Sequence, residues 1–208
     1  MVVAPEDEAA AMPSAKKPDN KDNSLQSALD ALIRPLHSAR SGCDYPFAEV
    51  EGALSRYERD YGLNLLPDFQ RGHVWNQGQQ QHYIENIMRG VIPQGTLLIQ
   101  FNAPHWDDDA YEGDLPREMQ IIDGLQRLTA IRKFLAGEVR PFGLGLEDLE
   151  GSRYAIKRSM WHVRFAFHTF SSKAELIGHY LALNAGGTPH SASEIERVRN
   201  LLAVAEGA

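Results

Sequence analysis

The chain has 208 residues, of which 43% are hydrophobic, and a formal net charge of −7 at pH 7. This length suits one domain with a small helical appendage, and no apolar run approaches the ~18 residues of a membrane span. The acidic balance argues against a free-standing, non-specific DNA binder, which gains affinity by neutralising phosphates. Cys43 is the single cysteine, which excludes an internal disulfide framework and a cysteine-based metal site. We therefore expect a cytoplasmic protein with no membrane partner.

The N-terminal part is predicted to be a tail followed by helices. Residues 1–23 are rich in proline, alanine, lysine and aspartate and lack the features of a secretory signal, so they are predicted to be disordered. Residues 24–62 place apolar side chains at helical spacing in two stretches, which end at Pro35 and Gly62. We therefore divide the chain into a disordered tail (1–23), N-terminal helices (24–62) and a main domain (63–208).

The main domain alternates short strands with helices, which predicts the α+β class. It has a small sheet, flanking helices and a helical C-terminus. The predicted strands lie at 63–66, 96–101, 119–123 and 161–170, and the predicted helices at 76–90, 125–137, 171–187 and 191–205.

The stretch MQIIDGLQRLTAIRKF, residues 119–134, indicates a buried strand, a turn and a helix that begins with Gln126 and Arg127. Helix N-termini expose unpaired N–H groups, and a glycine such as Gly124 lets an anion approach the backbone closely. The guanidinium of Arg127 can hold the same anion by two parallel hydrogen bonds. Asp123 can position water or Mg²⁺, or it can simply cap the helix, because Asp-Gly is also a common turn.

A second Gln-Arg pair lies in LPDFQRGHVW, where Gln70 and Arg71 follow a predicted strand. The two pairs can converge on one anion, although an isolated Gln-Arg dipeptide is usually a surface feature. His73 is a candidate general acid or base, or a polar loop residue. Trp75 is a candidate for stacking on a nucleotide base, or it is a core residue.

Four ordered motifs, LPDFQRGHVW, IENIMRGVIP, IIDGLQRLTAI and NAGGTPHS, resemble those of a known family. This family is the N-terminal domain of GmrSD-type modification-dependent restriction enzymes, within the ParB/sulfiredoxin-like superfamily. The resemblance covers roughly residues 60–206. It implies a ParB/sulfiredoxin-like mixed sheet with flanking helices, and hydrolysis of an NTP, with Mg²⁺, that controls DNA cleavage.

The resemblance implies that Gln70, Arg71, Asp123, Gly124, Gln126 and Arg127 line a nucleotide site. We assign catalytic roles to Asp123, Gln126 and Arg127, and expect Asp123 to be the Mg²⁺ ligand. The expected nucleotide contacts are Gln70, Arg71, Gly124, Arg127 and Thr129, and the additional candidates are His73, Trp75 and Asn184.

Two features depart from the family pattern. Position 125 is Leu where the family usually has Gln. If that Gln aligns the attacking water, hydrolysis here is slow or absent; if position 125 faces the core, the change is neutral. The eight histidines are scattered without a His–Asn–His arrangement, so we expect no intrinsic HNH-type nuclease module. A nuclease subunit is then an expected partner, and a homodimer is a possible assembly.

The charges of the chain are unevenly spread. From Gly151 to Phe170 there are four cations and no acid, which indicates an anion-binding or nucleic-acid-binding face, or a basic sheet edge facing water. From Asp107 to Glu118 there are six acids and one arginine, which indicates a solvated loop or a weak divalent-cation site.

Three hypotheses follow for the function. In the first, the chain binds an NTP, hydrolyses it and so acts in DNA processing or the restriction of foreign DNA. In the second, it transfers the phosphoryl group to DNA or a modified base. In the third, it is a non-catalytic nucleotide- or DNA-sensing regulator of a partner nuclease. Free phosphate, a phosphorylated product, or binding without turnover would distinguish them.

Overall fold

The structure, a computed structural model, describes residues 20–93, 95–106, 111–184 and 192–207. It consists of two compact units, residues 1–36 and residues 37–208. In the first unit, helix α1 (Asn20–Ile33) starts within the range predicted as a tail and stops before Pro35. The rest of the predicted tail lies outside the described residues.

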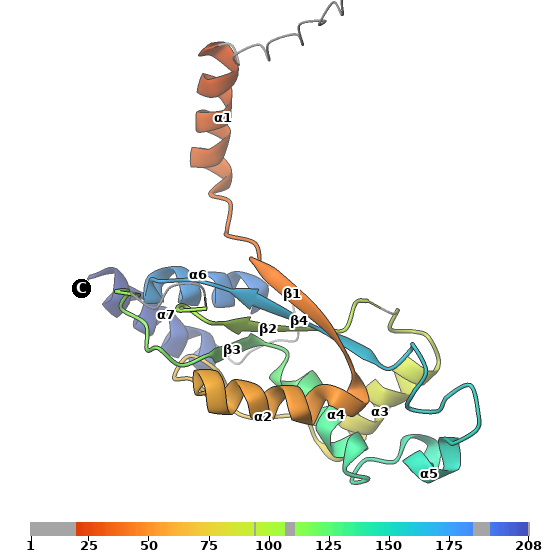
Figure 1. The fold of residues 1–208 in the computed structure, drawn as a ribbon. Helices are drawn as coiled ribbons and strands as arrows, with labels where there is room; N and C mark the ends of the chain where they lie inside the picture. The colour runs from red at the N-terminus through yellow and green to blue at the C-terminus, as the bar shows by residue number, and fades with distance from the viewer. Residues whose placement is uncertain (1–19, 94, 107–110, 185–191, 208) are drawn as a thin grey trace, which may run out of the picture. The chain divides into compact units, whose positions relative to one another are not determined.

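A four-stranded mixed sheet forms the centre of the second unit (Figure 1). β4 pairs parallel to β2 and antiparallel to β1, while β2 pairs antiparallel to β3. The helices and this sheet confirm the predicted α+β class. In their order across the sheet, the strands are β1 (Ser41–Pro46), β4 (His162–His168), β2 (Leu98–Asn102) and β3 (Gln120–Asp123).

Two of the strand assignments differ from the prediction. β1 was not predicted, because SGCDYP lacks an apolar alternation and is held from one side only, by β4. The strand predicted at 63–66 is wrong, because this segment forms a single bridge between Asn64 and Gln120. Pro67 follows at once and cannot donate to a ladder of backbone hydrogen bonds.

The helices of the second unit begin and end where local signals place them. Asn76 and Gln79 form a capping box at the start of α3. Gly62 ends α2 with a left-handed φ of 61°, and Gly137 follows α4 with φ 75°. The helical elements are the 3₁₀ turns η1 (Phe47–Glu49) and η2 (Pro141–Gly143), and the α-helices α2 (Val50–Tyr61), α3 (Gln77–Met88), α4 (Leu125–Leu135), α5 (Leu146–Leu149), α6 (Lys173–Asn184) and α7 (Ala192–Glu206).

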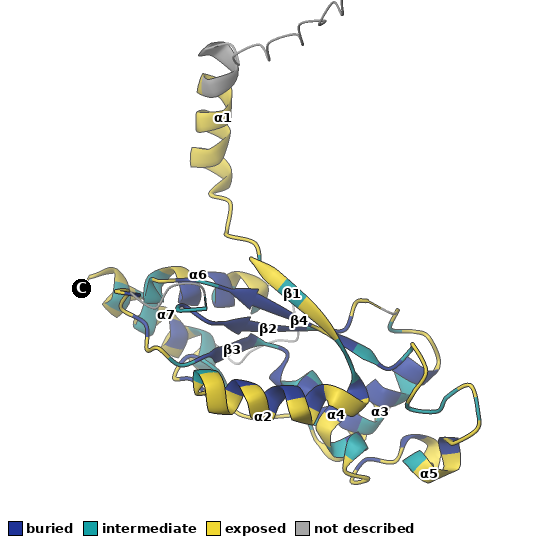
Figure 2. Ribbon diagram, viewed as in Figure 1, coloured by how far each residue is buried: buried dark blue, intermediate teal, exposed yellow. Residues whose placement is uncertain are grey.

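The sheet separates two hydrophobic cores, because successive side chains of a strand point to opposite faces. On one face, α2, α3 and α4 pack against strand residues such as Phe101, Ile121 and Phe165. On the other, Ile122 packs with Tyr180 of α6 and further apolar residues of α6 and α7. Figure 2 shows the buried strands between these helices.

The face that α6 covers also holds buried polar side chains. Asn102 accepts a hydrogen bond from Phe170 N at 2.8 Å, and His168 Nε2 bonds Gln100 Oε1 at 2.9 Å. Burial, together with the nearby His179, lowers the pKa of His168 to about 4, so this ring is neutral at pH 7.

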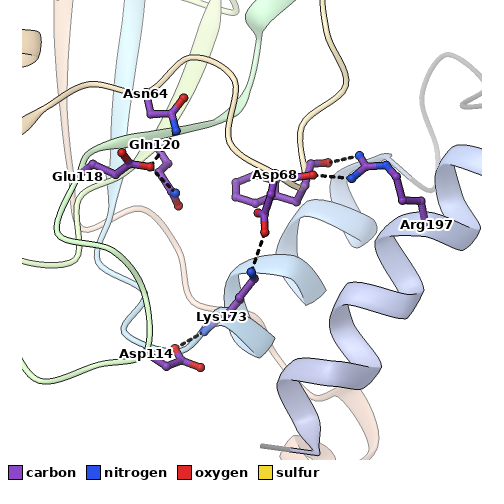
Figure 3. Close-up of polar contacts among 8 residues, drawn as sticks. Asn64, Asp68, Asp114, Glu118, Gln120, Lys173 and Arg197 are labelled. Atoms are coloured by element: carbon purple, nitrogen blue, oxygen red, sulfur yellow. Dashed lines mark hydrogen bonds and ion pairs between the residues drawn. The ribbon is translucent and has the colours of Figure 1, made fainter.

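A polar network fixes the segment that leads into Gln70 (Figure 3). Lys173 Nζ of α6 lies 2.7 Å from Asp68 Oδ2, and its backbone N–H donates to Asp114 Oδ1 at 2.6 Å. From α7, the guanidinium of Arg197 donates to the backbone carbonyls of Asp68 and Phe69. These contacts tie residues 68–69 to both C-terminal helices.

The turn between β3 and α4 requires glycine. Gly124 is the N-cap of α4 and has a left-handed φ of 97°. A Cβ at this position would lie 2.7 Å from Ile99 Cδ1 and 3.1 Å from the carbonyl oxygen of Leu98. The backbone therefore passes β2 too closely for any side chain.

We predict that Gly124→Ala lowers the free energy of unfolding by about 2–3 kcal/mol, from backbone strain and the clash with Ile99. Gly137→Ala is the matched control, because Gly137 also has a positive φ but a Cβ added there would have nothing within 4 Å. It should cost only about 1 kcal/mol. Urea unfolding of both variants measures the difference, and equal losses would contradict the role of the close approach.

Candidate functional site

The candidate site lies where β3 ends and α4 begins. Asp123 is the last residue of β3, and the N-cap position of α4 is taken by Gly124, so Asp123 does not occupy the capping position. Instead its Oδ2 accepts a hydrogen bond from Arg127 Nη2, one helical turn later. The two side chains are 32% and 27% exposed, so the ion pair is reachable from solvent.

Gln126 joins this turn to the first Gln-Arg segment. Its Oε1 accepts hydrogen bonds from the backbone N–H groups of Val74 at 2.9 Å and Trp75 at 3.1 Å. Its Nε2 donates to the carbonyl oxygen of Gly72 at 3.1 Å. Residues 70–75 and 123–127 are thus held side by side, and together we name them the Gln-Arg corner.

Gln70 makes a second connection within the Gln-Arg corner. Its Nε2 donates to the carbonyl oxygen of Ile122 at 3.2 Å, and its Oε1 accepts from Tyr180 Oη at 3.3 Å. The same oxygen accepts from the backbone N–H of Arg71 at 3.2 Å. The amides of Gln70 and Gln126 are therefore engaged within the protein, and both hold the corner together.

The arginines of the corner are less constrained than the glutamines. Arg71 is half-buried, and its guanidinium has no hydrogen bond or ion pair to another described residue. Burial raises the pKa of Tyr180, while the charge of Arg71 opposes that shift, which puts Arg71 close to the Tyr180 hydroxyl. The two Gln-Arg segments meet, and neither arginine is locked to a carboxylate inside the core.

Tyr83 and His179 are buried polar side chains that were not predicted as site residues. Tyr83 packs against Trp75 of the corner, whereas His179 lies against His168 and Phe170. Tyr83 Oη and both ring nitrogens of His179 have no hydrogen-bond partner among the described residues. Burial raises the pKa of Tyr83, with Arg127 and Asp123 acting in opposite directions, and burial lowers the pKa of His179 against the charge of Asp123. In the sequence, Tyr83 belongs to an apolar stripe. A tyrosine hydroxyl in such a stripe usually needs a hydrogen-bond partner, and this was the feature of the sequence that could have pointed to Tyr83.

His73 and Trp75 lie on the loop that Gln126 holds. The exposed ring of His73 hydrogen-bonds Gln80 through Nε2. Trp75 is half-buried and packs against Tyr83, with ring centroids 5.4 Å apart. Trp75 therefore packs onto the core beside the corner.

Thr129 and Asn184, the other two candidates, make side-chain hydrogen bonds within their own helices. Thr129 Oγ1 donates to the carbonyl oxygen of Leu125 at 2.8 Å, and Thr129 lines a shallow pocket with Arg132 and Lys133. Asn184 donates to the carbonyl oxygen of Tyr180 at 2.7 Å, at the end of α6. It lines a cavity of about 450 Å³ between α6 and α7, and the rest of its NAGGT motif lies outside the described residues.

The structure shows whether position 125, where the chain has Leu and the family usually has Gln, faces the core. Its side chain is 7% exposed and belongs to the core that α4 forms with α2 and α3. The side chain at position 125 therefore faces the protein interior.

The carboxylate of Asp123 offers little by itself to a cation. Among the described residues, no group of three or more His, Cys, Asp or Glu side chains could hold a metal ion. Mg²⁺ is commonly held by one or two carboxylates together with the phosphates of a substrate. Asp123 fits that role only when phosphate oxygens complete the shell.

Comparison with known proteins identifies the family. Residues 50–178, well over half of the chain, match the family described as "GmrSD restriction endonuclease, N-terminal domain". The chain belongs to this family, which implies involvement in the restriction of modified DNA. No curated protein and no solved structure matches the chain. The ParB/sulfiredoxin kinship thus stays a prediction. In the described part of the chain, no helix has the length and apolar character to cross a membrane.

We predict that Gln126→Leu loosens residues 72–75, because the amides of Val74 and Trp75 lose their shared acceptor. The free energy of unfolding should fall by about 1–2 kcal/mol, and hydrogen exchange at these two amides should accelerate. Gln81→Leu is the control, since that amide bonds only Glu85 within α3. Unchanged exchange at Val74 and Trp75 would contradict the holding role of Gln126.

We predict that Leu125→Gln, which restores the usual family residue, destabilises the protein by about 2–3 kcal/mol without raising NTP turnover, because it buries an amide in the core. Leu125→Met conserves volume and should cost less than about 1.5 kcal/mol. Thermal unfolding and phosphate release measure both variants. A gain of turnover in Leu125→Gln would show that position 125 reaches the ligand.

Proposed function

We propose that the chain binds a nucleoside triphosphate at the Gln-Arg corner and hydrolyses it, and that this step controls the restriction of DNA. The observation that best supports the proposal is the Gln126 amide. It ties the loop that follows Arg71 to the first turn of α4, where Arg127 lies. Two guanidinium groups from distant parts of the chain are thereby available to one polyphosphate.

Three groups of the corner suit a phosphate. The first backbone N–H groups of α4 have no side-chain cap, and they carry the partial positive charge of a helix N-terminus. Arg71 offers a guanidinium free of carboxylates among the described residues. Arg127, in the first turn of α4, offers the second guanidinium, while Gly124 lets this helix start close against β2. This donor set is the kind that binds phosphoryl oxygens in other proteins.

The Asp123–Arg127 pair suits an exchange of partners on binding. The ion pair is partly exposed, at 32% for Asp123 and 27% for Arg127, so a polyphosphate can reach Arg127 and compete with the carboxylate. The released carboxylate of Asp123 would then be free to hold Mg²⁺ or to orient water. When bound, Mg²⁺ would neutralise charge on the phosphates and polarise the reacting group.

Tyr83, whose ring packs against Trp75 of the corner, is a further polar side chain that could contact the ligand. Tyr83 keeps its proton at neutral pH because burial raises its pKa, so it can donate a hydrogen bond to a phosphate oxygen. The core position of Leu125 leaves this chemistry intact.

We predict that Arg127→Ala weakens NTP binding by about 30- to 150-fold, because it removes a charged hydrogen-bonding group worth roughly 2–3 kcal/mol. Phosphate release should fall in parallel. The measurements are titration with a labelled NTP and a phosphate-release assay, each with and without DNA. Arg132→Ala is the matched control, since Arg132 lies on the same helix but pairs with Glu51.

The same assay separates the alternatives. Equal binding by wild type and Arg127→Ala would contradict the proposed site. A stable phosphorylated product in place of free phosphate would favour phosphotransfer to DNA. Binding without turnover would favour a nucleotide-gated regulator of a partner nuclease.

A further inference from the structure

The loop between α5 and β4, residues 151–161, carries three cations on its outer side. Arg153, Lys157 and Arg158 are all exposed, and the loop contains no acid. Among the described residues, neither the ammonium of Lys157 nor the guanidinium of Arg158 has a hydrogen bond or ion pair. In a chain with 28 acids and 21 basic residues, such a stretch is a local positive surface on an acidic protein. We name residues 151–161 the cationic loop.

The cationic loop is anchored to the core. Trp161 is fully buried, and its Nε1 donates to the carbonyl oxygen of Tyr154 at 2.8 Å. A turn brings Arg158 N within 2.8 Å of the carbonyl oxygen of Ala155. Tyr154, Ile156 and Met160 pack against the core, so the backbone that carries the cations is held in place. Less entropy is lost when such a surface binds a partner.

A cavity of about 350 Å³ adjoins the cationic loop. Arg153, with its guanidinium 4.8 Å from the ring centroid of Tyr154, is at this cavity together with Arg89, which lies 4.9 Å from the ring of Phe142. In Figure 1 the loop and the segment that follows α3 lie at the same end of the unit. Apolar lining comes from Ile87, Met88, Ile92, Leu97 and Met160.

The acids of the neighbouring helix α5 are partly engaged elsewhere. Glu147 binds the guanidinium of Arg140, and Asp148 accepts a hydrogen bond from Gly145 N at 2.8 Å. Among the described residues, no ion pair joins these acids, or Glu150 at the C-cap of α5, to Lys157 or Arg158.

We propose that the cationic loop and its cavity bind the phosphate backbone of duplex DNA. Lys157 and Arg158 contact successive phosphates, and the apolar cavity beside Arg89 and Arg153 receives a sugar or base edge. Phosphate contacts of this kind position a protein on DNA without reading sequence. The choice of DNA rests on the restriction role in the proposed function, but it does not depend on nucleotide binding at the Gln-Arg corner.

The test is fluorescence anisotropy with a labelled duplex of about 20 base pairs, over roughly 50–200 mM salt and without nucleotide. Wild type should bind with an affinity that falls as salt rises. Lys157→Ala/Arg158→Ala should bind the duplex roughly 60-fold more weakly than wild type at 0.1 M salt, because two lost phosphate contacts change the affinity by about 1.8 log units for each decade of salt below 1 M. Its slope of log affinity against log salt should be smaller by about 1.8, which is the loss of two phosphate contacts at about 0.9 each.

The control Arg56→Ala/Arg59→Ala removes the same charge from exposed positions on α2. It should bind DNA as wild type does. Equal losses in the two double variants, no salt-dependent DNA binding by wild type, or tighter binding to an RNA duplex of the same sequence would each overturn the inference. Titration with a labelled NTP should be unchanged in Lys157→Ala/Arg158→Ala. Nucleotide binding without DNA binding would refute the DNA surface alone, and the reverse result would refute the nucleotide site alone.

Discussion

The arrangement of the Gln-Arg corner depends on one side-chain amide, that of Gln126. Residues 71–75 have no regular secondary structure, and three hydrogen bonds from this amide hold them against the first turn of α4. Ordering an irregular loop costs about 1–2 kcal/mol of entropy per residue, so such a loop needs specific contacts to stay in place. Gly124 sets the position from which Gln126 reaches this loop, because only glycine lets α4 start so close to β2.

The polar groups of the corner divide into those that the fold uses and those that it leaves available. The amides of Gln70 and Gln126 are bonded to backbone groups of other segments, and they act as supports. The guanidinium of Arg71 has no hydrogen bond or ion pair to a described residue, and Arg127 shares a partly exposed ion pair for which the proposed polyphosphate would compete. Among the described residues, the buried hydroxyl of Tyr83 has no hydrogen-bond partner, and leaving such a group unpaired is costly.

Helix α3 links the two anion-binding surfaces inferred in this domain. Its capping residue Asn76 follows Trp75 of the corner, and its C-cap Arg89 lies at the cavity beside the cationic loop. Twelve residues at 1.5 Å each span about 18 Å, so the two surfaces are separated by one rigid element. Nucleotide and DNA would therefore use different charges of the same domain, and neither would block the other.

Sequence by itself determined the features that depend on neighbours a few residues away. The capping box at Asn76, the left-handed stop at Gly62 and the strand–glycine–helix order around Gly124 all follow from local geometry. The fold class and the family were also evident from the sequence. Tertiary structure alone decided that Gln70 and Gln126 are supports, that Leu125 faces the core, and that SGCDYP is a strand. Each of these depends on partners dozens of residues or more away in the chain, or on which side of a helix is covered, and no local pattern encodes either.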